Sequence, residues 1–99
     1  MIDLLSKIYV DLNELVIRKV PHDKEILNTR IIKEHTKICE YCFNIKSSNK
    51  DKNYMLEFKV SIKYILFILN YFVSKKIINN DVYKIIEKEY KDLYYIINP

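Results

Sequence analysis

The chain has 99 residues, 49% of them hydrophobic, and carries 17 Lys and Arg against 13 Asp and Glu, a formal net charge of +4. It contains no glycine and only two prolines, which excludes the glycine-rich phosphate loops of Rossmann and P-loop proteins and argues against sheets and tight hairpins. We therefore expect one helical domain over residues 1–99, whose mild basic charge hints at nucleic acid, an anionic membrane or an acidic protein as partner.

The first apolar stripe recurs at steps of three and four residues and consists of Leu5, Ile8, Leu12 and Leu15. It predicts a helix over about residues 3–19, which ends before Pro21 because the residue preceding a proline is pushed out of the α-helical region. The same segment, MIDLLSKIYVDL, lacks the basic leader and the small-residue cleavage site of a secretory signal.

The second stripe predicts a long amphipathic helix over about residues 22–46, with Asp23 as a candidate N-cap. Its members are Leu27, Ile31, His35, Ile38, Cys42 and Ile45. The polar segment SSNKDK, residues 47–52, interrupts the periodicity and predicts a loop.

The third stripe predicts a helix over about residues 53–74 and consists of Met55, Phe58, Ile62, Ile65, Leu69 and Phe72. Further apolar residues make this helix apolar over most of its circumference, as in a central or interfacial helix. Its apolar run YILFILNYFV is about ten residues long, well short of the roughly twenty that span a bilayer. We expect a cytoplasmic protein with no membrane partner, whose two cysteines stay reduced.

The last helix is predicted over about residues 81–97, with Asn79, Asn80 and Asp81 as candidate N-caps. Its stripe consists of Val82, Ile86, Tyr90, Leu93 and Ile97. Four helices joined by short connections predict an all-α fold, an antiparallel four-helix bundle.

Three residues of the second helix could offer tetrahedral metal ligands, because His35, Cys39 and Cys42 lie at positions i, i+4 and i+7. We favour the alternative that they are core residues, since His35 and Cys42 fall on the apolar stripe. A fourth ligand would require His22 to swing in. We therefore expect no metal.

No catalytic constellation is visible. Mid-helix thiols lack the helix N-terminus that normally lowers the pKa of a redox cysteine, and the core-facing stripe offers neither a cleft nor an oxyanion hole. The carboxylates of the last helix alternate with lysines at the spacing of surface ion pairs. We expect no enzymatic activity and no cofactor.

Cations form one row on each of three predicted helices. These rows are Arg30, Lys33 and Lys37; Lys52, Lys59 and Lys63; and Lys84, Lys88 and Lys91. The simplest interpretation is that each row is a solvated face, but the first is followed at the next step by an aromatic residue, Tyr41. Our candidates for binding nucleic acid or a partner are Arg30, Lys33, Lys37, Lys59 and Lys63.

The order of these segments resembles a known family. ELVIRKVP is followed by LNTRIIKEHTKICEYCFNI, a short polar loop and EFKVSIKYILFILNYFVSKKIINNDVYKIIEKEY. This pattern resembles the four-helix-bundle family of 23S rRNA intervening-sequence proteins, and within it the accessory variability determinant proteins of diversity-generating retroelements. The shared features are Pro21, the length of the second helix, Lys63 within the apolar third helix and the INNDVYKIIEKEY start of the last helix, over residues 8–97.

The resemblance implies a homopentamer with a central channel, whose basic ring binds a reverse transcriptase and its RNA. A ring would repeat each lysine row around its axis, so that a modest charge becomes a strong field. The expected function is thus that of a non-enzymatic, oligomeric accessory protein that binds RNA or DNA and a reverse transcriptase.

The alternative function is that of a structural protein–protein interaction bundle with no nucleic-acid role, whose apolar third helix docks on one partner. The two functions differ in their response to salt. Nucleic-acid affinity falls steeply as salt rises, because binding releases counterions, whereas an apolar docking surface barely responds.

Overall fold

The computed structural model describes the backbone of residues 1–44 and 52–98, and the side chains of residues 1–44 and 55–98. Four α-helices account for most of it: α1 (Ile2–Asp11), α2 (Glu25–Asn44), α3 (Lys52–Ser74) and α4 (Asn80–Ile97). Two predicted features lie outside the described residues. They are the end of the second helix, at residues 45–46, and the loop at residues 47–52, of which only the Lys52 backbone is described.

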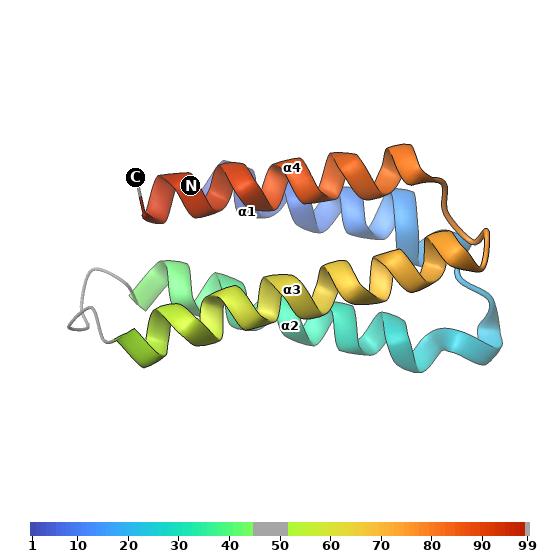
Figure 1. Cartoon of the computed structure of the whole chain (residues 1–99), viewed down its shortest axis with the longest axis horizontal. Coiled ribbons are helices and arrows are strands. Elements are labelled where there is room, and N and C mark those ends of the chain that lie inside the picture. The colour runs from blue at the N-terminus through green and yellow to red at the C-terminus, as the bar shows by residue number, and fades with distance from the viewer. Residues whose placement is uncertain (45–51, 99) are drawn as a thin grey trace.

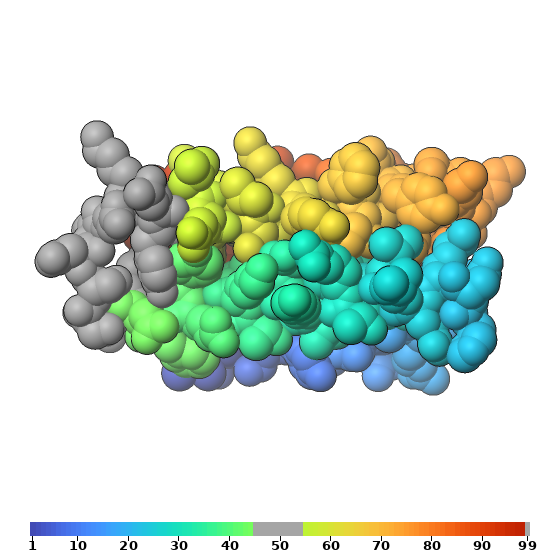
Figure 2. Space-filling model, turned by 90° about the horizontal axis from the view of Figure 1, so that it is seen from below, coloured from blue at the N-terminus to red at the C-terminus, as the bar shows by residue number. Residues whose placement is uncertain are grey.

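The helices form two layers, α1 beside α4 and α2 beside α3, in a body of 41 × 22 × 19 Å (Figure 1). Successive helices run in opposite directions, and both termini lie at the same end (Figure 1). Seen from below, α2 and α3 lie side by side along one face, with α1 at its edge (Figure 2). The predicted all-α antiparallel four-helix bundle is therefore confirmed.

The first helix departs from the expected regular pattern. After α1 the chain continues as a π-helical turn, Leu12–Val16, and a 3-10 turn, Ile17–Lys19. A π-helical turn holds more residues than an α-helical one, so the side chain that follows Leu12 into the core is Val16, whereas Leu15 is only half-buried. The helical segment ends at Val20, whose extended ψ of 128° precedes Pro21 as expected.

The helix starts agree only in part with the predicted caps. Asp23 does not cap α2, because it lies inside a 3-10 turn, His22–Lys24, which Pro21 introduces. Asn79 is the cap of α4, since its Oδ1 accepts a hydrogen bond from the Val82 amide at 3.0 Å.

The end of α3 has the hydrogen bonds of a Schellman motif. The Ile77 amide donates to the Phe72 carbonyl at 2.9 Å and the Lys76 amide to the Val73 carbonyl at 3.0 Å. Lys76 has a φ of +61°, the left-handed conformation that glycine usually supplies. A lysine occupies it in a chain that contains no glycine.

The core is formed by apolar residues of all four helices. Its fully buried side chains include Ile8, Leu12, Val16, Ile31, Ile38, Ile65, Leu69, Phe72, Ile86 and Leu93. The stripe Leu56, Val60, Tyr64 and Phe67 is instead exposed, and its first three members line the side of α3 that faces α2. We call it the outer stripe of α3. No helix in the described part of the chain combines the length and the apolar character needed to cross a membrane.

Candidate nucleic-acid interface

The predicted binding residues are divided between the two sides of α3. A groove of about 740 Å³ between α2 and α3 contains Arg30 and Lys37, and a groove of about 490 Å³ between α3 and α4 contains Lys59 and Lys63. Lys33 is exposed and lines neither groove. The structure therefore does not bring the five candidates together in one site.

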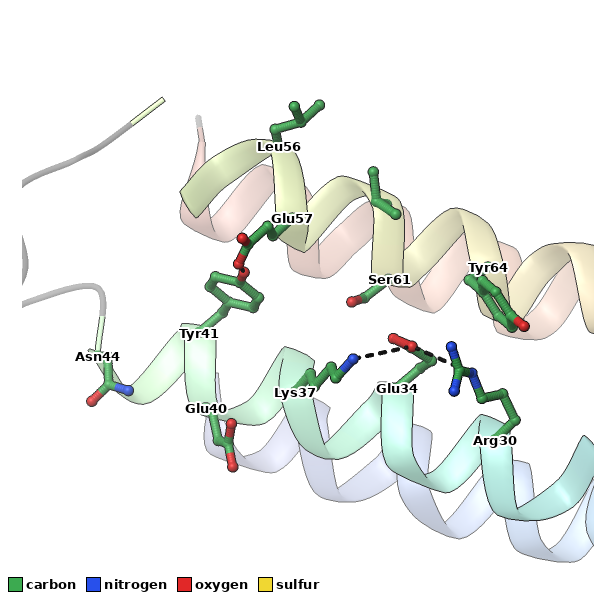
Figure 3. Close-up of a pocket in the computed structure, with 11 residues that line it drawn as sticks. Arg30, Glu34, Lys37, Glu40, Tyr41, Asn44, Leu56, Glu57, Ser61 and Tyr64 are labelled. Carbon is green, nitrogen blue, oxygen red and sulfur yellow. Dashed lines mark hydrogen bonds and ion pairs between the residues drawn. The ribbon is translucent and has the colours of Figure 1, made fainter. Parts of the chain in front are cut away.

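The α2–α3 groove is organised around a buried carboxylate that was not among the predicted site residues. Glu34 is 4% exposed, and its Oε1 lies 3.7 Å from Arg30 Nε and 3.5 Å from Lys37 Nζ (Figure 3). Ser61, on α3, points toward Glu34 from the facing wall (Figure 3). Two of the three cations in the predicted row are thus already paired with a carboxylate of their own helix.

The rest of this groove adds aromatic rings and further negative charge. The Tyr41 hydroxyl donates a hydrogen bond to Glu57, and the Arg30 guanidinium lies 4.9 Å from the centre of the Tyr64 ring. Including Glu40, three carboxylates face two cations among its described lining residues. This balance is unfavourable for a polyanion.

The α3–α4 groove has the opposite charge. Lys59 and Lys63 lie on its α3 wall and Lys91 on its α4 wall, and none of its eight described lining residues is acidic. One of these lysines has an ion pair with a residue that does not line the groove, since Lys91 Nζ lies 3.8 Å from Glu87 Oε1. This groove has the charge that an approaching phosphate requires.

Aromatic side chains accompany these lysines. Lys59 Nζ lies 5.3 Å from the centre of the Tyr94 ring, and hydrogen bonds from Lys59 and then Asn98 lower the pKa of the Tyr94 hydroxyl. Tyr95 stands at the edge of the groove and is 68% exposed. Half-buried Ile62 and Leu66 complete the lining together with a buried tyrosine, Tyr90.

Three residues of this groove were not selected from the sequence. Lys91 was recognised only as part of a cation row, and Tyr94 and Tyr95 were missed as site residues. A weak signal was present, because Lys91, Tyr94 and Tyr95 fall within about one turn of a helix. Which row of α3 faces them depends on the packing of α4, and periodicity alone does not give this. The pairing of two rows across a groove became visible only in the structure.

The potential metal ligands occupy the core. His35 is buried and both its ring nitrogens are engaged, since Nδ1 lies 2.8 Å from the Tyr90 hydroxyl and Nε2 lies 3.2 Å from the Leu5 carbonyl oxygen. A neutral ring satisfies both contacts, with Nε2–H donating to the carbonyl and Nδ1 accepting from the tyrosine. Burial lowers the pKa of His35, which favours this neutral form.

Neither cysteine has an activated thiol. Burial raises the pKa of Cys39 and raises that of Cys42 to about 12, so neither thiol has a tendency to ionise at neutral pH. Within the part of the chain that the structure describes, no group of three or more His, Cys, Asp or Glu side chains is arranged to hold a metal ion.

Comparisons with protein-family models, with curated proteins and with solved structures returned no match. The fold and the grooves together define an all-α four-helix bundle with a basic, aromatic groove on one side of α3 and an acid-rich groove on the other.

Proposed function

We propose that this protein is a non-enzymatic, oligomeric accessory protein that binds nucleic acid in its α3–α4 groove and, following the family resemblance, a reverse transcriptase. One observation carries the nucleic-acid part. Three lysines converge on a groove whose described lining contains no carboxylate and includes exposed tyrosine. Lysine ammonium groups bind phosphates, and the counterions that they release supply sequence-independent affinity.

The oligomer is supported by the outer stripe of α3. Leu56, Val60 and Phe67 are each more than half exposed and belong to a helix that buries a different stripe, with Phe58, Ile65 and Phe72, in the core. A surface of this kind commonly marks an interaction site. In the pentamer that the resemblance implies, each groove would occur five times, which multiplies the positive field that a long nucleic acid encounters.

A second candidate function follows from the same stripe. If the apolar face of α3 docks on a different protein, the bundle is an interaction module and the lysines keep it in solution. This candidate requires no nucleic-acid affinity.

The test of the proposed function is a salt titration of RNA binding. The wild type is compared with a Lys59→Glu, Lys63→Glu variant, and Lys33→Glu, a change outside both grooves, is the control. Each lysine–phosphate pair that the variant removes should flatten the slope of log affinity against log salt by about 0.7 for a single strand, and the control should keep the wild-type slope. Equal slopes in all three proteins, or no RNA binding at low salt, would favour the interaction module instead.

A further inference from the structure

The α3–α4 groove presents flat apolar surface as well as charge. Its lining combines two tyrosines, Tyr94 and Tyr95, with two half-buried aliphatic residues, Ile62 and Leu66. A groove that served phosphate alone would need only the lysines. The aromatic and aliphatic surface suits a ligand that offers exposed flat rings.

Tyr94 is held rigidly by its neighbours. Its ring stacks on Phe58, with ring centres 6.4 Å apart and an angle of 22° between the planes. The Asn98 side chain donates to its hydroxyl at 2.9 Å, and Lys59 Nζ lies 5.3 Å from the centre of its ring. These contacts hold the Tyr94 ring beside Lys59, so a ligand meets a preorganised cation next to an aromatic ring.

Tyr95 differs from Tyr94 in being exposed over 68% of its surface. A large exposed ring at the edge of a groove lined with lysines provides the two components of single-strand recognition, a stacking platform and a charged track. Lys59 and Lys63 are one helical turn apart, about 6 Å along α3, and Lys91 faces them from α4. The lysines thus flank the groove on both walls.

We propose that the groove binds single-stranded nucleic acid in preference to a duplex, with the phosphates on Lys59, Lys63 and Lys91 and a base stacked on Tyr95. This inference rests on the proposed function and specifies its ligand. In a duplex the base faces are stacked on one another and only base edges and backbone are accessible, so a duplex can use the lysines but not the ring of Tyr95. A single strand can use both.

The α2–α3 groove does not offer the same combination. Its Tyr41 hydroxyl is bonded to Glu57 and its Tyr64 ring is covered by Arg30. Three carboxylates line it. These carboxylates would repel the phosphates that accompany the bases of a single strand.

The experiment compares binding of a fluorescently labelled twelve-nucleotide oligouridylate with binding of a labelled twelve-base-pair RNA duplex at equal salt. The proteins are the wild type and the variants Tyr95→Ala, Tyr95→Phe and Tyr9→Ala. The last variant changes an exposed tyrosine of α1 and serves as the control. We expect the wild type to prefer the single strand. Tyr95→Ala should weaken single-strand binding about tenfold, the effect of losing one stacked base, and leave duplex binding unchanged. Tyr95→Phe and Tyr9→Ala should behave as the wild type.

The outcomes separate this inference from the proposed function. If duplex and single strand bind equally and Tyr95→Ala changes neither, the single-strand inference is wrong, while weaker binding of both RNAs by the Lys59→Glu, Lys63→Glu variant would still support nucleic-acid binding. If neither RNA binds at low salt, both proposals are wrong. If Tyr95→Phe is as weak as Tyr95→Ala, the tyrosine acts through its hydroxyl and the stacking role is overturned.

Discussion

At the scale of single residues, Glu89 of α4 is the least satisfied carboxylate in the described core. It is 7% exposed; its Oε2 lies 3.2 Å from Lys7 Nζ, and its Oε1 is buried without a hydrogen-bond partner. Lys7 Nζ also lies 2.9 Å from Oδ2 of Asp11, the residue that precedes the π-helical turn. Burial, followed by the neighbouring Asp11 carboxylate, raises the pKa of Glu89 to about 7.

This pKa makes stability depend on pH. Between pH 4.5, the ordinary value of the carboxyl group, and about 7, the folded protein holds a proton that the unfolded chain releases. Stability should therefore fall as pH rises through this window and stay low above it. Glu89→Gln should remove this dependence and stabilise the protein at pH 8 by about 1–2 kcal/mol, since water around exposed Lys7 screens part of the effect.

The measurement is urea denaturation of the wild type and of Glu89→Gln at pH 5 and pH 8, with Glu87→Gln on the same helix as control. His35 is present in all three proteins, so its own titration cancels in the comparison. A difference between wild type and Glu89→Gln that is the same at both pH values would show that Glu89 is already ionised at pH 5.

Glu34 gives a second prediction at this scale. Arg30→Glu would place a like charge beside a carboxylate that is 4% exposed, and we expect it to destabilise the fold by about 2 kcal/mol. Lys33→Glu, at a position with no ion pair to Glu34, should change stability by less than about 0.5 kcal/mol. Thermal unfolding followed by circular dichroism distinguishes the two, and equal melting temperatures would mean that Glu34 does not depend on its ion pair.

At the scale of the helix, Lys76 is the clearest strained position. Lys76 has a φ of +61°. This left-handed conformation costs free energy in a residue that has a Cβ atom, but not in glycine. Lys76→Gly should stabilise the protein by about 1 kcal/mol. The neighbouring change Lys75→Gly is the control and should give no gain, because Lys75 lacks a positive φ. Chemical denaturation measures both, and destabilisation by Lys76→Gly would contradict the assigned turn.

The sequence was most informative about the positions of the helices. Leu27, Ile31 and Ile38 recur at the helical period, and the predicted α2 begins within three residues of the observed helix. Periodicity predicts such stripes because it reports burial directly. It missed the π-helical turn, since Leu15 and Val16 are equally apolar and only the packing of the bundle decides which of them is buried.

The candidate site was less accessible from the sequence. Arg30 and Lys37 looked like part of a uniform basic row, because a glutamate such as Glu34 between two cations normally lies in solvent. Its burial follows from the close approach of α3 along α2, a tertiary fact. Lys59 and Lys63 were predicted as a pair on one helix, but their neighbours on α4 could not be predicted without the packing of the bundle.

At the scale of the whole molecule, the exposed outer stripe of α3 predicts self-association. The wild type should sediment at several times the chain mass of 12.0 kDa. Phe67→Glu, which charges a side chain that is 74% exposed, should lower the mass without unfolding the bundle. Ile26→Glu, a similarly exposed apolar position on α2, is the matched control and should leave the assembly intact. A wild type that sediments at the monomer mass at micromolar concentration would contradict the oligomer.

The central claim is that nucleic acid lies in the α3–α4 groove, and crosslinking tests it most directly. RNA containing 4-thiouridine is bound to the wild-type protein, irradiated, and the crosslinked peptides are identified by mass spectrometry. We expect the crosslinks to fall on residues 59–66 of α3 and 90–95 of α4, and to disappear at high salt. Crosslinks confined to residues 30–37 of α2, or none above the level of a protein that does not bind RNA, would contradict the claim.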